Sequence, residues 1–257
     1  MDLEKIYVEE DLFPREITFY EKRDYGFLFY NEENKDSYDS NHALIFKDKV
    51  SDLKQTLDDI IRFYTEKGIS PNIYQSICDC GYFEEMKNTL WEYGFKSWTE
   101  PQKYMILSEK SEKPAFFSQI VSNTKIVVRK VSEWKEEYGT EIFEKAGEPW
   151  EIGVAKRALD NCNTLFFVAF YENQPAGMTY AHINSGVCRV NYLLVPNEHR
   201  NKGVGRALMH CFSDYCERNQ IKNCYLWTDG ETAEKIYYEA GFRYIETRQA
   251  GRAAYVN

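Results

Sequence analysis

The chain has 257 residues and a formal net charge of -9, with no basic stripe beyond the local group Arg200, Lys202 and Arg206. This balance excludes nucleic acid as the main partner, and an acidic surface favours a cationic substrate such as an amine, although the same charge also serves solubility. The charged start Met1–Lys5 and the strand-sized apolar runs lack the pattern of a signal peptide or a membrane span, so we expect a cytoplasmic protein with no membrane partner.

The first 110 residues are predicted to form one unit. Short β-branched and aromatic runs predict strands, and apolar residues spaced by three and four predict helices that end at Gly68 and Gly94. The predicted elements are strands Ile17–Phe19, Gly26–Asn31 and Ala43–Phe46, a helix from Ser51, a helix Tyr82–Tyr93 and a strand Lys103–Leu107. The charged residues that follow contain a repeated Ser-Glu-Lys and a proline, which predicts an exposed linker over 111–124.

Residues 125–257 show a stronger pattern of alternating strands and helices. Asn173-Gln174 and Asn184-Ser185-Gly186 are typical hairpin turns between its central strands. The predicted elements are a strand Lys125–Lys130, helices Ser132–Lys145 and Glu151–Leu159, strands Leu165–Tyr171, Gly177–Ile183 and Val187–Val195, a helix Gly205–Asn219, a strand Cys224–Thr228, a helix Thr232–Glu239, and a closing hairpin of Phe242–Thr247 with Ala253–Val256.

The seven cysteines form an odd set with no Cys-x-x-Cys and no histidine at zinc spacing. We therefore expect reduced, mostly buried thiols and no metal site.

A strand-to-turn-to-helix segment carries the clearest chemical signal. The buried strand Val190–Val195 is stopped by Pro196, and the following turn contains Gly203 and Gly205 immediately before a helix. Glycines let the backbone approach a ligand closely, so that N–H groups at a helix N-terminus can bind a pyrophosphate. The segment is not a nucleotide-binding P-loop, because no Lys-Ser or Lys-Thr follows either glycine. It is not a dinucleotide-binding fingerprint either, because Gly203 lies too far beyond the end of the strand.

This segment resembles the GNAT superfamily of acyl-CoA-dependent N-acetyltransferases, which carry Arg/Gln-x-x-Gly-x-Gly/Ala at this place. The resemblance implies a coenzyme A pyrophosphate loop and a backbone edge for the pantetheine arm. The residues so implied are Leu193, Leu194, Val195, Arg200, Asn201, Lys202, Gly203, Val204, Gly205 and Arg206. It also implies an α/β chain of the α+β type with two GNAT-like units in tandem, each a mixed, mostly antiparallel sheet flanked by helices. The unit 125–257 is complete, whereas the unit 1–110 is degenerate and has no glycine near Phe46–Leu53 to hold a phosphate.

A second motif, Tyr237-Tyr238-Glu239-Ala240-Gly241-Phe242, ends a predicted helix at a glycine. GNAT enzymes usually carry Tyr-x-x-x-Gly-Phe here, and the resemblance implies that the Tyr237 hydroxyl lies near the coenzyme sulfur and protonates the departing thiolate. Tyr238 is expected on another side of the helix, with a packing role. Many relatives have an asparagine seven residues before the tyrosine, where this chain has Gly230.

No general base is evident on the central strand. An alkylammonium must lose a proton before it can attack a thioester, and His182, Asp229, Glu151 or a chain of waters are the candidates.

Together these observations predict an N-acetyltransferase that uses acetyl-CoA as cosubstrate and acylates a primary amine by direct attack, with no covalent intermediate. The amine could belong to a small molecule, a peptide or a protein, and the enzyme could be a monomer or a homodimer. One alternative is a non-catalytic acyl-CoA-binding regulator. Another is a tandem-GNAT aminoacyl or peptidyl transferase that uses charged tRNA, but the intact phosphate loop argues against it.

Overall fold

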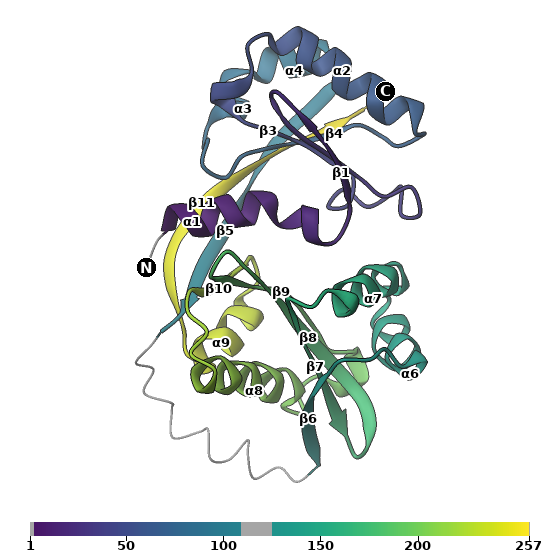
Figure 1. Cartoon of the computed structure of the whole chain (residues 1–257), viewed down its shortest axis with the longest axis vertical. Coiled ribbons are helices and arrows are strands. Elements are labelled where there is room, and N and C mark those ends of the chain that lie inside the picture. The colour runs from purple at the N-terminus through teal and green to yellow at the C-terminus, as the bar shows by residue number, and fades with distance from the viewer. Residues whose placement is uncertain (1–2, 109–124, 257) are drawn as a thin grey trace. The chain divides into compact units, whose positions relative to one another are not determined.

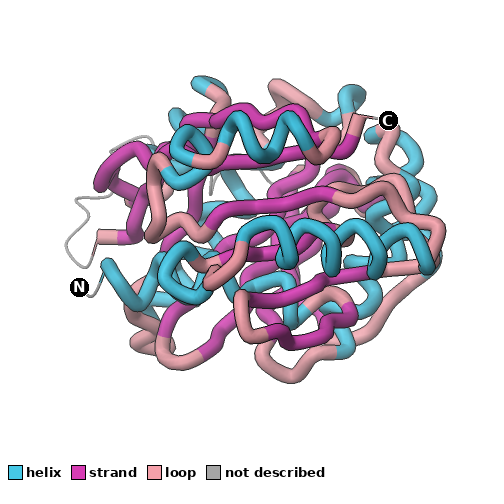
Figure 2. The backbone as a smooth tube through the Cα atoms, turned by 90° about the horizontal axis from the view of Figure 1, so that it is seen from above, coloured by secondary structure: helices cyan, strands magenta, loops and turns pink. Residues whose placement is uncertain are grey.

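The computed structural model describes residues 3–108 and 125–256. The predicted linker 111–124 lies outside these residues. Figure 2, with helices in cyan and strands in magenta, shows helices flanking the strands. None of the described helices is both long enough and apolar enough to cross a membrane.

The described chain divides into two compact units. They are an N-terminal unit of residues 3–102 and 247–256, and a C-terminal unit of residues 103–108 and 125–246. Two long strands, β5 (Phe95–Leu107) and β11 (Phe242–Tyr255), contribute to both units (Figure 1). The units therefore differ in extent from the predicted domains 1–110 and 125–257, and those domain boundaries stay a prediction.

The C-terminal unit is a mixed sheet between two helical layers. Its strands are β6 (Ile126–Val131), β7 (Thr164–Tyr171), β8 (Gln174–Asn184), β9 (Val187–Leu194) and β10 (Cys224–Thr228), with the adjoining parts of β5 and β11. Its helices are α6 (Glu136–Tyr138), the π-helical turn η3 (Gly139–Glu144), η4 (Pro149–Glu151), α7 (Ile152–Asp160), η5 (Asn197–His199), α8 (Val204–Arg218) and α9 (Glu231–Glu239). Neighbouring strands from β6 to β9 pair antiparallel, and β10 pairs antiparallel with β5 but parallel with β9.

The two faces of this sheet carry separate cores. Helices α8 and α9 cover one face, and α6 and α7 lie on the other (Figure 1). The buried side of α8 follows from residues spaced by three and four, namely Leu208, Phe212 and Cys216. Strands β7 and β8 are buried on both faces, which explains their nearly continuous apolar sequences. Each fully buried leucine or phenylalanine contributes about 1.5–3 kcal/mol to folding.

The N-terminal unit is a smaller sheet with its own core. Its elements are α1 (Leu3–Leu12), η1 (Phe13–Glu16), β1 (Phe19–Arg23), β2 (Gly26–Tyr30), β3 (His42–Ile45), η2 (Lys47–Lys49), α2 (Leu53–Glu66), β4 (Asn72–Gln75), α3 (Tyr82–Glu85) and α4 (Lys87–Glu92), with parts of β5 and β11. The strand order is β1-β2-β3-β4-β11, with a parallel pair only between β3 and β4 among the pairs described. Leu57, Ile60 and Tyr64 bury the inner side of α2.

The predicted closing hairpin is wrong. Residues Phe242–Tyr255 form one continuous strand of 14 residues, whose later part pairs antiparallel with β4. Gly251 is needed for close approach and not for a turn, because a Cβ there would lie 2.4 Å from the Gln75 side chain.

Helix α1 and strand β4 were not predicted, and β5 begins earlier than expected. The buried residues of α1 include Glu9 and Asp11 beside Ile6 and Tyr7, so the helix has no apolar periodicity to detect. Strand β4 has only 4 residues.

All seven cysteines are free thiols, but the expectation that most are buried was wrong. Three are buried, Cys211 is half-buried, and Cys78, Cys80 and Cys162 are exposed.

Candidate functional site

Strands β9 and β10 form a fork in the C-terminal unit. Their parallel pairing covers Cys224 with Cys188 and Tyr225 with Arg189. Beyond these pairs β10 remains paired with β5 as far as Thr228, while β9 remains paired with β8. The edge of β9 that faces β10 therefore keeps backbone N–H and C=O groups available for an extended ligand. The divergence begins after Arg189, so Leu193 and Leu194 both lie on the diverging part of β9.

A β-bulge lies where the fork opens. Tyr180 on β8 is opposite Tyr192, and the next residue, Ala181, is opposite Val190, so Asn191 is the extra residue on β9. A bulge bends its strand and increases the local twist, which directs β9 away from β10. The Asn191 amide donates to the Tyr180 hydroxyl and its oxygen accepts from Arg189, so the bulged residue is held in place.

The N-terminus of α8 lies against the end of β9. A Cβ placed on Gly205 would lie 3.7 Å from Val195 Cγ2, 4.0 Å from Leu193 Cδ2 and 3.5 Å from Ile236 Cδ1 of α9. The helix begins after Gly203, which has a φ of 90° and offers no side-chain cap. The first N–H groups of an uncapped helix need acceptors and carry the positive end of its dipole. This arrangement suits an anionic group.

Gly177 on β8 allows the loop to pack this closely, a role that no motif in the sequence indicates. A Cβ there would lie 2.9 Å from the Leu194 carbonyl oxygen and 3.0 Å from Val204 Cγ1. Any side chain at this position would push the end of β9 and the start of α8 away from β8.

The basic residues of the predicted phosphate loop have different surroundings. The Arg200 Nε donates to the Val195 carbonyl at 3.1 Å. The Lys202 Nζ lies 4.7 Å from the centre of the Tyr171 ring. The Arg206 Nε contacts Glu239 Oε2 at 2.5 Å and ties α8 to α9, so its charge already has a partner. Asn201 has a φ of 60°, which completes the turn into Gly203. Arg200 and Lys202 are exposed and are the cations better placed to meet a phosphate.

Tyr237 and Tyr238 differ as their helix positions predict. Tyr237, like Leu193 and Val195, packs against the core cluster on this face of the sheet, and its ring contacts Phe242 edge-on at 6.2 Å between centroids. Its hydroxyl has no hydrogen-bond partner among the residues that the structure describes. Burial, with a smaller contribution from Asp229, raises the pKa of Tyr237 to about 12. Tyr238 is 55% exposed and lies under the Arg243 guanidinium, so its expected packing is limited to this surface contact.

The three residues predicted as candidate bases differ in burial and in their distance from the fork. His182 is buried opposite Arg189, near the hairpin end of β8, with its Nδ1 3.3 Å from Thr164 Oγ1. Asp229 is exposed at the end of β10. Glu151 lies close enough to Tyr180 and Tyr192 to raise the pKa of both phenols, after the larger effect of burial.

Glu148 is a further acidic residue beside Tyr192, and it is not among the bases predicted from the sequence. It accepts a hydrogen bond from the Tyr192 hydroxyl, and this contact adds to the burial that raises the pKa of Tyr192. Glu148 and Glu151 thus form an acidic wall beside the bulge, with the exposed Trp150 between them in sequence. The only sequence signal was the Gly147-Glu148-Pro149 break between two helices.

The start of helix α2 in the described part of the N-terminal unit does not offer an equivalent anion site. Its helix α2 is capped by Asp52, whose side chain accepts from the Gln55 N–H at 3.1 Å. A carboxylate already occupies the position where a phosphate would bind, and it would repel a second anion.

Comparison with known proteins identifies the C-terminal region. The family described as an acetyltransferase (GNAT) domain matches residues 135–253. A GCN5-related N-acetyltransferase from Kribbella flavida is 12% identical, with a TM-score of 0.64 over 98% of this chain and 95% of that one. A functionally unknown conserved protein from Staphylococcus epidermidis ATCC 12228 is 13% identical, with a TM-score of 0.62 over 97% and 98%.

A tandem GNAT protein from the clavulanic acid biosynthesis pathway is 11% identical, with a TM-score of 0.54 over 84% of this chain and 76% of that one. At these identities the likeness concerns the fold. No curated protein matches the chain. The predicted fold class and the predicted resemblance are confirmed.

Proposed function

Since residues 135–253 form a GNAT acetyltransferase domain, a fold that supports acyl-CoA-dependent acetyl transfer, we propose that this chain is an N-acetyltransferase. It transfers the acetyl group of acetyl-CoA to a primary amine by direct attack in a ternary complex. The observation that carries the proposal is the fork between β9 and β10, with the uncapped N-terminus of α8 beside the end of β9.

The coenzyme is held at two places. The pyrophosphate accepts hydrogen bonds from the N–H groups at the start of α8, around Gly203 and Gly205, and Arg200 and Lys202 add positive charge. The pantetheine arm lies in the fork and pairs with the backbone of Leu193 and Val195, as an added strand pairs with a sheet edge. A backbone N–H at the bulge stabilises the oxyanion that forms when the thioester carbonyl is attacked.

Tyr237 protonates the departing thiolate. A donor for this step must keep its proton until the thiolate leaves, and the raised pKa of Tyr237 ensures that its hydroxyl is protonated at neutral pH. Because the hydroxyl has no partner among the described residues, no hydrogen bond has to break before it can donate.

The amine approaches from the acidic wall on the other side of β9. Glu148 and Glu151 attract an ammonium, and Tyr192 connects Glu148 to the strand that holds the thioester. The ammonium loses its proton to Glu148, directly or through a water, and the neutral amine then attacks the carbonyl carbon. The negative charge on the oxygen returns to re-form the carbonyl, the C–S bond breaks, and the sulfur takes the proton from Tyr237. The amide nitrogen releases its second proton to solvent, and Tyr237 regains a proton from solvent.

Acetyl-CoA should raise the thermal stability of the protein. A ligand that binds only the folded state adds about 2.7 kcal/mol at a hundred times its dissociation constant, which corresponds to a rise in Tm of about 5–10 °C for a domain of this size. Differential scanning fluorimetry measures the shift, with ATP and NAD as controls. An equal shift from ATP would remove the coenzyme assignment, and a shift without acetyl transfer to any member of an amine panel would favour the acyl-CoA-binding regulator.

Glu148→Gln should weaken the use of cationic amines. Hydrogen bonds to a charged group contribute about 1.5–3 kcal/mol, so we expect kcat/KM for a diamine or polyamine to fall by about 10- to 100-fold. The affinity for acetyl-CoA should not change.

Glu144→Gln is the matched control, because Glu144 is exposed on the preceding helical turn. Equal effects of the two substitutions on kcat/KM would mean that general surface charge, and not the acidic wall, attracts the amine.

A further inference from the structure

Three buried thiols meet in the C-terminal unit. Cys188 on β9, Cys216 on α8 and Cys224 on β10 have Sγ atoms that all lie within 4.8 Å of one another. No other group of three histidine, cysteine or acidic side chains in the described part of the chain is close enough to share a metal ion. The acetyl-transfer mechanism uses none of the three.

The backbone fixes the positions of these thiols. Cys188 and Cys224 are register partners in the parallel pair of β9 and β10, directly before the two strands diverge. Cys216 belongs to the buried side of α8 and packs in the same core cluster. The sulfurs thus come from three elements that are held together by the core itself.

We propose that Cys188, Cys216 and Cys224 bind one thiophilic metal ion of the zinc and cadmium class through three thiolate ligands. Zinc lies about 2.3 Å from a thiolate sulfur, and tetrahedral ligands at that distance are about 3.8 Å apart. The widest pair of sulfurs, at no more than 4.8 Å, therefore needs to close by at most about 1 Å. A disulfide would use two of the thiols and leave the third unused, whereas a metal ion uses all three.

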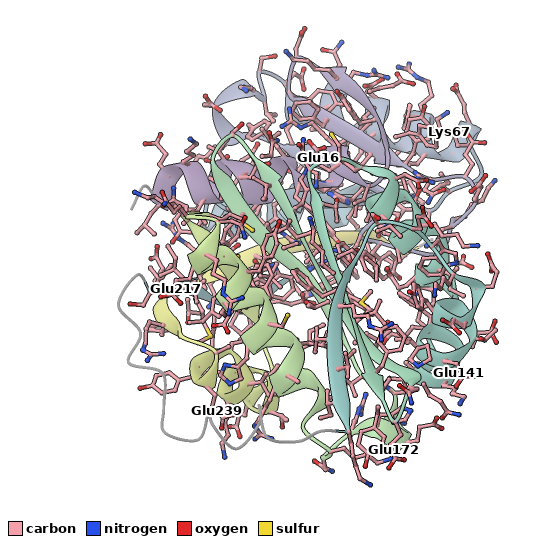
Figure 3. The ribbon with its side chains drawn as sticks, turned by 60° about the horizontal axis from the view of Figure 1, so that its bottom comes forward. Glu16, Lys67, Glu141, Glu172, Glu217 and Glu239 are labelled. Atoms are coloured by element: carbon pink, nitrogen blue, oxygen red, sulfur yellow. The ribbon has the colours of Figure 1, made fainter. Side chains whose placement is uncertain are left out.

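A cavity lies beside the thiols, and two of the three cysteines contribute to its lining although their side chains are buried. It has a volume of about 250 Å³ and is lined by Cys216 and Cys224, and also by His210 and Lys222. Glu217 of α8 and Glu239 of α9, both labelled in Figure 3, lie in its wall as well. Zinc with three protein ligands takes a water or another small ligand in the fourth position. Three thiolates and a divalent ion carry a net charge of -1, and the exposed Lys222 also lines the cavity.

Metal binding replaces three S–H bonds by three metal–sulfur bonds and releases up to three protons to solvent, without a change of oxidation state. A bound ion would join β9, α8 and β10 at the closed end of the fork.

The test uses the full chain with the exposed thiols removed by Cys78→Ser, Cys80→Ser and Cys162→Ser. Titration with Cd²⁺ should give a thiolate-to-cadmium charge-transfer absorption that saturates at one ion per chain. With one equivalent of Zn²⁺, X-ray absorption should report three sulfur neighbours at about 2.3 Å. Absence of binding, or two or fewer sulfur neighbours, would overturn the proposal, and because the core cysteines are intact in this protein, misfolding of a core variant does not affect the result.

Single substitutions in the same background locate the site. Cys216→Ala should weaken Cd²⁺ binding by about 100-fold or more, since even outer-shell partners contribute about 10- to 100-fold. Cys211→Ala is the matched control, because Cys211 is half-buried on the same helix, and it should leave binding unchanged. An equal loss from both would place the ion elsewhere, and circular dichroism checks that each variant is folded.

Discussion

Replacing Tyr237 by phenylalanine should lower kcat by about 10²- to 10⁴-fold, the usual contribution of general acid catalysis, while acetyl-CoA affinity stays near normal. The ring keeps its contacts with the core and with Phe242, so the fold and the coenzyme site should survive. Only the hydroxyl that meets the departing thiolate is lost. Steady-state kinetics with a confirmed amine, together with calorimetric binding of acetyl-CoA, separates the two quantities.

The pH dependence gives an independent check on Tyr237. The donor form of a phenol is present below its pKa and lost above it. Because the pKa of Tyr237 is raised to about 12, ionisation of this residue should lower kcat only as the pH approaches 12. A falling limb of the kcat profile near neutral pH that disappears in Tyr237→Phe would contradict the raised pKa.

Tyr238→Phe is the matched control on the same helix. Tyr238 is 55% exposed, and the contacts of its ring and its backbone carbonyl with Arg243 do not involve the hydroxyl. We expect kcat to stay within about twofold of the natural protein, as surface changes usually do. If Tyr238→Phe is the more damaging change, the acid is the neighbouring residue, and if neither matters, water protonates the thiolate.

Gly203→Asp should weaken acetyl-CoA binding by about 10³-fold. A carboxylate at the start of α8 would lie close to the pyrophosphate, and two like charges about 4 Å apart near a protein surface repel by about 4 kcal/mol. The change fits sterically, because an added Cβ would lie 3.7 Å from Ile126 Cδ1. Isothermal calorimetry of acetyl-CoA binding measures the loss.

Two controls separate charge from backbone strain at this position. Gly203→Asn has the same shape and the same φ of 90° but no charge, so it should keep most of the affinity. Gly81 has a φ of 89°, is the N-cap of α3, and has no atom within 4 Å of an added Cβ. Gly81→Asp therefore introduces the same strain outside the site and should leave binding unchanged. If Gly203→Asp and Gly203→Asn bind equally well, no phosphate lies at the start of α8.

From the sequence alone, Gly203 and Gly205 are equally suitable positions for an aspartate substitution that tests coenzyme binding. The structure distinguishes the two positions. An added Cβ at Gly205 points toward Ile236, Val195 and Leu193. Aspartate there would place a charge among apolar side chains, which destabilises the fold. Loss of coenzyme binding in Gly205→Asp would therefore be ambiguous, and Gly203→Asp is the cleaner experiment.

Local sequence patterns were sufficient for most of the C-terminal unit. Helix α8 and strands β9 and β10 have long or strongly apolar patterns bounded by proline, glycine or polar turns, and their observed ends lie within one or two residues of the predicted ones. The turn before α8 was also predictable from the sequence, because glycine adopts a positive φ without steric strain and so marks a turn of this kind. The sequence therefore determined the order of the elements from β6 to α9 and the candidate phosphate loop.

Only the tertiary structure decided the features in which residues far apart in the sequence come into contact. Glu148 and Tyr192 meet across 44 positions of sequence, and the three core thiols come from a strand, a helix and another strand. Strand β11 continues past Gly251 because β4 supplies a partner and the Gln75 side chain fills the space of a Cβ. The sequence of a segment carries its backbone preferences and its periodicity, whereas strand partners, the fork between β9 and β10, and the meeting of side chains are fixed only when the cores pack.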